Sequence, residues 1–71
     1  MPKPLPLARA IEIAGSQSAL ARLTGHSQPN ISRWLRLHGG RVPAEAAVAI
    51  EKATGVSRRE LRPDLWSQEA A

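Results

Sequence analysis

The sequence predicts an all-α protein, with five short helices around one core. Apolar residues recur at helical spacing in five successive segments, and each segment carries a residue suited to capping or ending a helix. No stretch has the period-two alternation of a half-buried strand, and no repeat or linker divides the 71 residues. We therefore expect a single domain over residues 1–71, with flexible ends at 1–5 and 67–71.

The first two helices follow a proline-rich start, MPKPLP. Apolar residues at helical spacing predict the first helix from about Leu5 to Ala14, with Gly15 as its stop. The segment QSALARLT, residues 17–24, predicts a short second helix that Ser16 can cap and Gly25 can end.

The third helix is predicted from about Gln28 to Leu37. Ser27 is its expected N-cap, because Pro29 then falls in the first turn, where a missing backbone N–H costs nothing. Gly39 and Gly40 follow as the stop.

The fourth helix is predicted in AEAAVAIEKAT, residues 44–54, which Pro43 opens and Gly55 ends. Its alanine-rich sequence favours a helix, and its buried face should include Ala47 and Ile50.

A fifth, short helix is predicted from Arg58 to Arg62. Ser57 and Glu60 have the spacing of a capping box, and the helix must stop before Pro63. The remaining residues, PDLWSQEAA, are expected to form an irregular tail.

The second and third predicted helices are joined across T-G-H-S, which is typical of a helix-turn-helix unit. Gly25 lies where this turn needs a residue that tolerates positive φ. Ala21 must be small because the two helices cross there, while Ile31 and Trp34 should anchor the second helix to the core. The unit therefore predicts a protein that binds DNA.

Polar side chains should face outward from the third helix once Ile31 and Trp34 face inward. In a helix-turn-helix protein the second helix of the unit enters the major groove amino end first. Gln28 could bond adenine, Arg33 guanine and Ser32 either base. The predicted base contacts are Gln28, Pro29, Ser32 and Arg33.

Phosphate contacts are predicted at Gln17, Ser27, Asn30, Arg22, Arg36 and Arg41. Lys3 is a further candidate for the sequence-independent electrostatic attraction. Ten Lys and Arg residues against six Asp and Glu residues give a net charge of +4, which favours a polyanionic partner. Double-stranded operator DNA is the partner that these residues predict.

Other chemistries fit the composition poorly. The chain has no cysteine and two histidines, so we expect no metal site and no cofactor. His26 beside Ser27 lacks an acid in sequence to orient it, and Glu45 and Glu51 are six residues apart, so we expect no enzyme. No apolar run could span a bilayer and no signal peptide is evident, so the expected location is the cytoplasm, with no membrane partner.

The runs GSQSALARLTGHSQPNISRWLR and GGRVPAEAAVAIEKATGVSRRELRPDLW resemble small prophage Cro/YdaS-type regulators, in the wider lambda-repressor-like helix-turn-helix group. The resemblance covers about Leu7 to Trp66. It implies an all-α domain that binds operator DNA as a transcriptional regulator, often a repressor, with some YdaS-like proteins called antitoxins. Thr24 and His26 depart from the wider pattern, which more often has aliphatic residues there; this leaves open how tightly the turn packs.

Dimerisation and protein partners depend on the carboxyl-terminal region. The chain lacks the alternating strand by which some Cro proteins dimerise, so a homodimer on DNA would use helices or the segment with Leu65 and Trp66. We favour Trp66 folding back onto the first helix. The alternative is an antitoxin-like module that binds a toxin or polymerase through this region; a DNA-targeting accessory factor is a further alternative. Arg58, Arg59 and Arg62 either extend the DNA footprint or, as we favour, are simply solvated.

Overall fold

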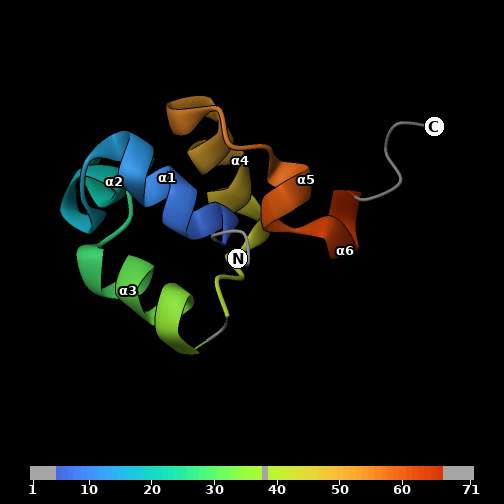
Figure 1. Cartoon of the computed structure of the whole chain (residues 1–71), viewed down its shortest axis with the longest axis horizontal. Coiled ribbons are helices and arrows are strands. Elements are labelled where there is room, and N and C mark those ends of the chain that lie inside the picture. Colours follow the sequence, from blue (N-terminus) through green and yellow to red (C-terminus); the bar gives the residue numbers. More distant parts are fainter. Residues whose placement is uncertain (1–4, 38, 67–71) are drawn as a thin grey trace.

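The computed structural model describes residues 5–37 and 39–66, and the described residues form six helices and no strand. The helices are α1 (Pro6–Ala14), α2 (Gln17–Thr24), α3 (Gln28–Leu37), α4 (Ala44–Thr54), α5 (Arg58–Leu61) and α6 (Pro63–Trp66) (Figure 1). The all-α prediction is confirmed. Lys3, His38 and the expected flexible ends, apart from Leu5, lie outside the described residues.

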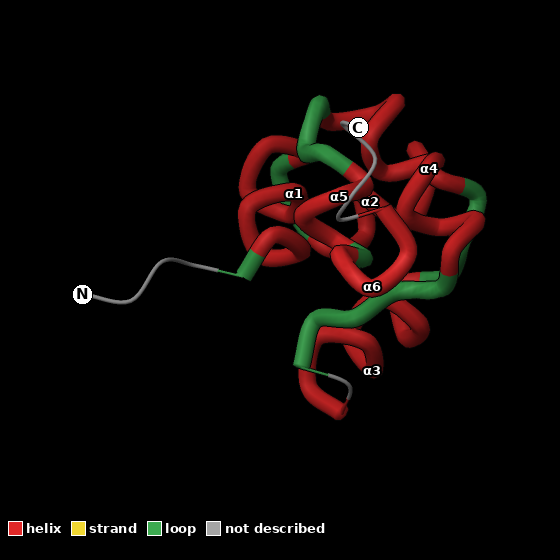
Figure 2. Tube along the Cα trace, turned by 90° about the vertical axis from the view of Figure 1, so that its right-hand side faces the viewer, coloured by secondary structure: helices red, strands yellow, loops and turns green. Residues whose placement is uncertain are grey.

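The core lies where α1, α2, α4 and α5 meet. It contains Leu7, Ala10, Leu20, Ala21, Ile31, Trp34, Val42, Ala46, Ala47, Ile50, Val56 and Leu61. Ala47 and Ile50 are fully buried, which confirms the predicted inner face of α4. In both views α3 lies at the lower edge of the molecule, where it packs chiefly against α2 (Figures 1 and 2).

Local signals position most helix ends as predicted. Leu5 is the N-cap residue of α1 rather than its first residue, and Gly15 ends that helix by donating its N–H to the Ile11 carbonyl. The Ser16 hydroxyl accepts the Ala19 N–H at 3.0 Å and so caps α2. Pro43 and Gly55 flank α4 as expected.

The capping box predicted at α5 forms only in part. The Ser57 hydroxyl accepts a backbone N–H, that of Arg59, at 3.0 Å. The Glu60 side chain does not return to the Ser57 backbone, because its carboxylate forms an ion pair with Arg9 of α1. A charged partner on the neighbouring helix α1, in an exposed ion pair, thus replaces the local hydrogen bond of the box.

The expectation of an irregular tail after Arg62 is wrong for residues 63–66, because Pro63 starts α6 instead of ending helical structure. The rest of the predicted tail, residues 67–71, lies outside the described residues. Proline is well tolerated at the first position of a helix, where its missing N–H is not needed. The Arg62 carbonyl accepts the N–H groups of Leu65 at 3.0 Å and Trp66 at 3.2 Å, which closes this single turn. Within residues 5–37 and 39–66, no helix has the length and apolar character that crossing a membrane requires.

Candidate nucleic-acid interface

The turn between α2 and α3 is closed by backbone hydrogen bonds. Gly25 has φ +78°, a left-handed conformation that suits glycine. The His26 N–H donates to the Ala21 carbonyl at 3.0 Å, which is the six-to-one bond of a Schellman motif. These bonds fix the angle at which α3 leaves α2, as the helix-turn-helix prediction requires.

The two departures from the wider pattern pack well in this turn. The Thr24 hydroxyl donates to the Leu20 carbonyl at 2.8 Å, so its polar atom is satisfied within α2. The His26 ring lies edge-on to the Trp34 ring, with centroids 5.1 Å apart and planes at 74°. The Thr24 hydroxyl is therefore hydrogen-bonded within α2, and the His26 ring adds a contact with the core residue Trp34.

The inner face of α3 is attached to the core by two side chains. Ile31 is fully buried and Trp34 is 9% exposed, which confirms both as core residues. At the amino end, the Ser27 hydroxyl accepts the Asn30 N–H at 3.3 Å, as the predicted N-cap should. This hydroxyl keeps its own proton and can still donate it to a phosphate oxygen.

The outer face of α3 presents the predicted base-contacting side chains. Gln28, Pro29 and Arg33 are exposed, while Ser32 and Asn30 are half-buried. The face is therefore exposed along most of its length, starting from Gln28 and Pro29 in the first turn of the helix.

One contact joins two residues that the sequence analysis treated separately. The Gln28 side-chain amide donates to the side-chain carbonyl of Gln17 at 2.7 Å. Gln17 is the first residue of α2, so this bond ties the amino ends of α2 and α3 together. Gln28 retains its carbonyl oxygen and a second N–H, which are the two groups that a bidentate contact with adenine uses.

The charge distribution along the chain singles out the same region. No Asp or Glu occurs between Glu12 and Glu45, whereas this interval holds Arg22, Arg33, Arg36 and Arg41. The remaining six cations equal the six acids in number, so the whole net charge of +4 falls in residues 13–44. The totals of charged residues do not reveal this gap in the acids, which is visible only in the order of residues along the chain.

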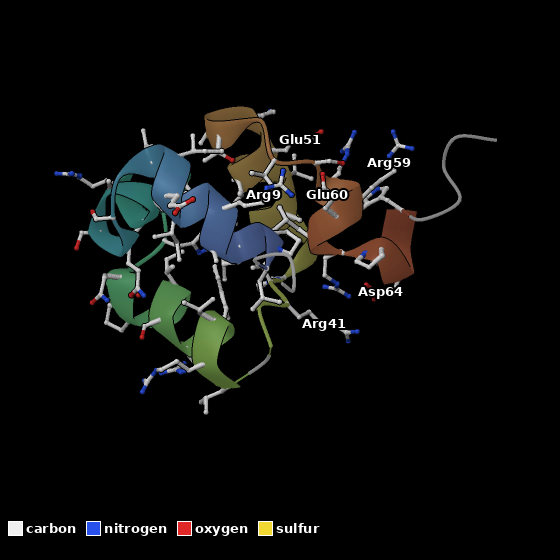
Figure 3. The ribbon with its side chains drawn as sticks, in the orientation of Figure 1. Arg9, Arg41, Glu51, Arg59, Glu60 and Asp64 are labelled. Atoms are coloured by element: carbon white, nitrogen blue, oxygen red, sulfur yellow. The ribbon has the colours of Figure 1, made fainter. Side chains whose placement is uncertain are left out.

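The ion pairs of the described residues lie away from α2 and α3. Figure 3 shows Arg9 and Glu60 pointing toward each other between α1 and α5. Arg58 lies 3.3 Å from the Glu51 carboxylate and stacks on the Trp66 ring at 5.5 Å. These contacts neutralise cations at the α1–α5 side of the molecule.

Arg62 and Asp64 form a third ion pair, which is bidentate. Arg62 Nε and Nη2 donate to the two Asp64 carboxylate oxygens at 2.9 Å and 2.7 Å. The Arg62 guanidinium lowers the pKa of Asp64 to about 2, with a smaller contribution from Arg41, and the same pair raises the pKa of Arg62. Two members of the predicted basic group, Arg58 and Arg62, are therefore paired rather than simply solvated.

The carboxyl-terminal apolar residues divide between core and surface. Trp66 is half-buried and packs on the core, and the Arg58 guanidinium of α5 lies over its ring. Folding back onto the first helix stays a prediction. Leu65 remains 49% exposed. Among the described residues, no three His, Cys, Asp or Glu side chains come together in a way that could hold a metal ion.

An all-α domain with this turn and this outward-facing third helix is a helix-turn-helix domain of the Cro type. The solved structure of the Cro protein from "putative prophage element Xfaso 1" in Xylella fastidiosa strain Ann-1 superposes with a TM-score of 0.79. That protein is 45% identical, and the match covers 87% of this chain and 95% of the Cro chain.

The chain belongs to the family described as bacterial toxin YdaS, whose model matches residues 7–69. The Escherichia coli K12 protein named "Putative transcriptional regulator YdaS" is 48% identical over 63 residues, which cover 83% of this chain. The chain spans only 62% of the length of that relative.

Proposed function

We propose that this protein is a sequence-specific DNA-binding transcriptional regulator that reads the major groove with α3. The observation that carries the proposal is the location of the entire net charge of +4 in residues 13–44, which include α2, α3 and the loop after α3. A segment whose charged residues are all arginines draws a polyanion, and α3 has an exposed polar face on which to read base edges.

The proposed contacts divide into two groups. Gln28, Pro29, Ser32 and Arg33 would touch base edges, with the hydrogen bond that Gln28 donates to Gln17 holding the Gln28 amide in place. The proposed phosphate contacts are Gln17, Ser27, Asn30, Arg22, Arg36 and Arg41. This division is what makes the proposal testable, because base contacts affect sequence choice and phosphate contacts affect every sequence alike.

The proposed mechanism is occupancy of an operator, as in a Cro-type repressor in the cytoplasm. A domain this small would block polymerase or a competing regulator by steric exclusion, which needs neither catalysis nor a cofactor. We propose that two copies bind one face of the duplex, with half-sites about 34 Å apart.

The test begins with selection of the preferred DNA from a random duplex library. On the selected site, Arg33→Ala should cost about 1–3 kcal/mol and relax choice at one base pair. Arg36→Ala should weaken selected and random duplexes by the same factor. Lys52→Ala, on α4 and outside the helix-turn-helix unit, is the matched loss of one charge. Equal behaviour of the three variants would overturn the proposed roles.

A second candidate function is a protein-binding module, of the antitoxin type or one that contacts polymerase. The observation in its favour is Leu65, which is 49% exposed next to the half-buried Trp66. This candidate predicts that Trp66→Ala abolishes function in cells while Arg33→Ala leaves it intact. The DNA-reading function predicts the opposite pattern.

A further inference from the structure

The motif Arg62-Pro63-Asp64 has no role in the contacts proposed so far. Among the described residues, however, its arginine is the cation with the most side-chain hydrogen bonds. Besides its two bonds to Asp64, Arg62 donates from Nη1 to the backbone carbonyl of Val42 at 2.9 Å. Val42 belongs to the loop between α3 and α4, so Arg62 joins the carboxyl-terminal helices to the loop that follows α3.

The position of Arg62 is fixed from both sides along the backbone. Its N–H donates to the Arg58 carbonyl at 2.8 Å, and its carbonyl accepts the Leu65 N–H at 3.0 Å. The side chain is only 16% exposed, and Asp64 holds two of its guanidinium nitrogens. The third nitrogen, Nη1, is thereby directed at the Val42 carbonyl, and the side chain keeps little conformational freedom.

The loop has a second anchor on the other side of Arg41. The Gly40 N–H donates to the Trp34 carbonyl at 2.9 Å, and Gly40 is buried beneath the Leu5 side chain with φ +89°. Val42 is 1% exposed, so its side chain is held in the core. Arg41 is thus the exposed residue between two fixed neighbours.

The Arg41 side chain lies below α5 and α6 in the view of Figure 3, on the lower side of the molecule that α3 also occupies. Its guanidinium contributes to the lowered pKa of Asp64, which places it within electrostatic reach of the Arg62–Asp64 pair. Anchoring the backbone on both sides of Arg41 limits the positions that its side chain can reach, so less conformational entropy is lost when the guanidinium meets a phosphate.

We propose that Arg62 and Asp64 are positioning residues for DNA binding: together they hold the Val42 carbonyl and so fix Arg41 for contact with a phosphate. This inference rests on the proposed function. It assigns to the carboxyl-terminal helices a part in DNA binding although neither Arg62 nor Asp64 touches the duplex.

The experiment measures the slope of log affinity against log salt for the full chain on a random duplex. Arg62→Gln combined with Asp64→Asn removes the pair without changing the net charge. Arg9→Gln combined with Glu60→Gln is the matched control, because these two side chains bond to each other and the ion pair includes no hydrogen bond to the loop. We expect the first double variant to lose about 0.9 from the slope, as Arg41→Gln does, and the control to keep the full slope.

Adding Arg41→Gln to the variant without the pair should change the slope no further. A full slope without the pair, or a further loss on adding Arg41→Gln, would overturn the inference. If Arg41→Gln alone leaves a salt-dependent slope unchanged, the inference fails while DNA binding stands. Absence of salt-dependent binding by the wild-type chain would refute the proposed function and this inference with it.

Should the double variant fail to fold, Arg62→Lys decides the question. A single ammonium keeps the charge but cannot reproduce the planar fork that meets Asp64 and Val42 together. We expect Arg62→Lys to lose the same part of the slope at unchanged helicity, and a full slope for this variant would overturn the inference.

Discussion

Replacement of Trp34 by alanine tests whether α3 is held by its two core side chains. Trp34 is 9% exposed, so nearly the whole indole leaves water on folding, and truncation should cost about 3–5 kcal/mol. The edge-on contact with the His26 ring is lost in the same truncation and is part of this cost. A domain of 71 residues has roughly 4–11 kcal/mol of stability in total, so Trp34→Ala should remove about half of it.

The assay is urea unfolding followed by far-ultraviolet circular dichroism. We expect a lower midpoint for Trp34→Ala and an unchanged m-value, since the fold and its buried area stay nearly the same. Trp66→Ala is the matched control: Trp66 is half-buried on a one-turn helix and should cost less than about 2 kcal/mol. Equal midpoints for Trp34→Ala and the wild-type chain would refute the anchoring of α3 by Trp34.

Three further predictions concern the turn, acid stability and the glutamine pair. Gly25→Ala should lower the free energy of unfolding in urea by about 1–2 kcal/mol, because alanine is strained in the left-handed conformation at φ +78°. The added Cβ meets nothing within 4 Å, so no steric clash contributes, and an unchanged midpoint would contradict this prediction. The lowered pKa of Asp64 means that its ion pair with Arg62 stabilises the fold above the ordinary pKa near 3.8 and that this contribution is lost as pH falls through about 2. Melting temperatures of the wild-type chain and Asp64→Asn should therefore differ at pH 6 and converge toward pH 2; a constant difference would refute the assignment. Gln17→Ala and Gln28→Ala should be non-additive in DNA affinity by about 0.5–1.5 kcal/mol, since either change breaks the same bond, and full additivity would show that the bond does not orient Gln28.

The helix-turn-helix unit was predictable because its signals are local. Ser16 accepts an N–H three residues on, and Gly25 ends α2 in a left-handed conformation that few other residues adopt. Ile31 and Trp34 fall on one side of a helix by their spacing alone, and both are core residues. None of these features depends on a partner from a distant part of the chain.

Two predictions of local structure from the sequence failed, the capping box at Glu60 and the irregular tail from Pro63. In the first a distant residue competed with a local hydrogen bond, and in the second one residue type is compatible with two structures. Glu60 has the spacing of a capping box, but Arg9, 51 residues away, takes its carboxylate. Pro63 can end one helix or begin another, and the Arg62 carbonyl determines that it begins α6. Local sequence contains neither the position of Arg9 nor the direction of that carbonyl.

The sequence by itself determined that this is a small all-α domain of the helix-turn-helix type, because periodicity and capping depend on neighbouring residues. It also determined that the net charge falls in residues 13–44. Only the tertiary structure decided which cations form ion pairs or hydrogen bonds within the protein and are therefore less available to DNA. Arg58 and Arg62 lie in a basic segment of the sequence, yet one binds Glu51 and the other Asp64 and the Val42 backbone. The partner of a long side chain depends on which groups folding places within hydrogen-bonding distance, and composition cannot specify this.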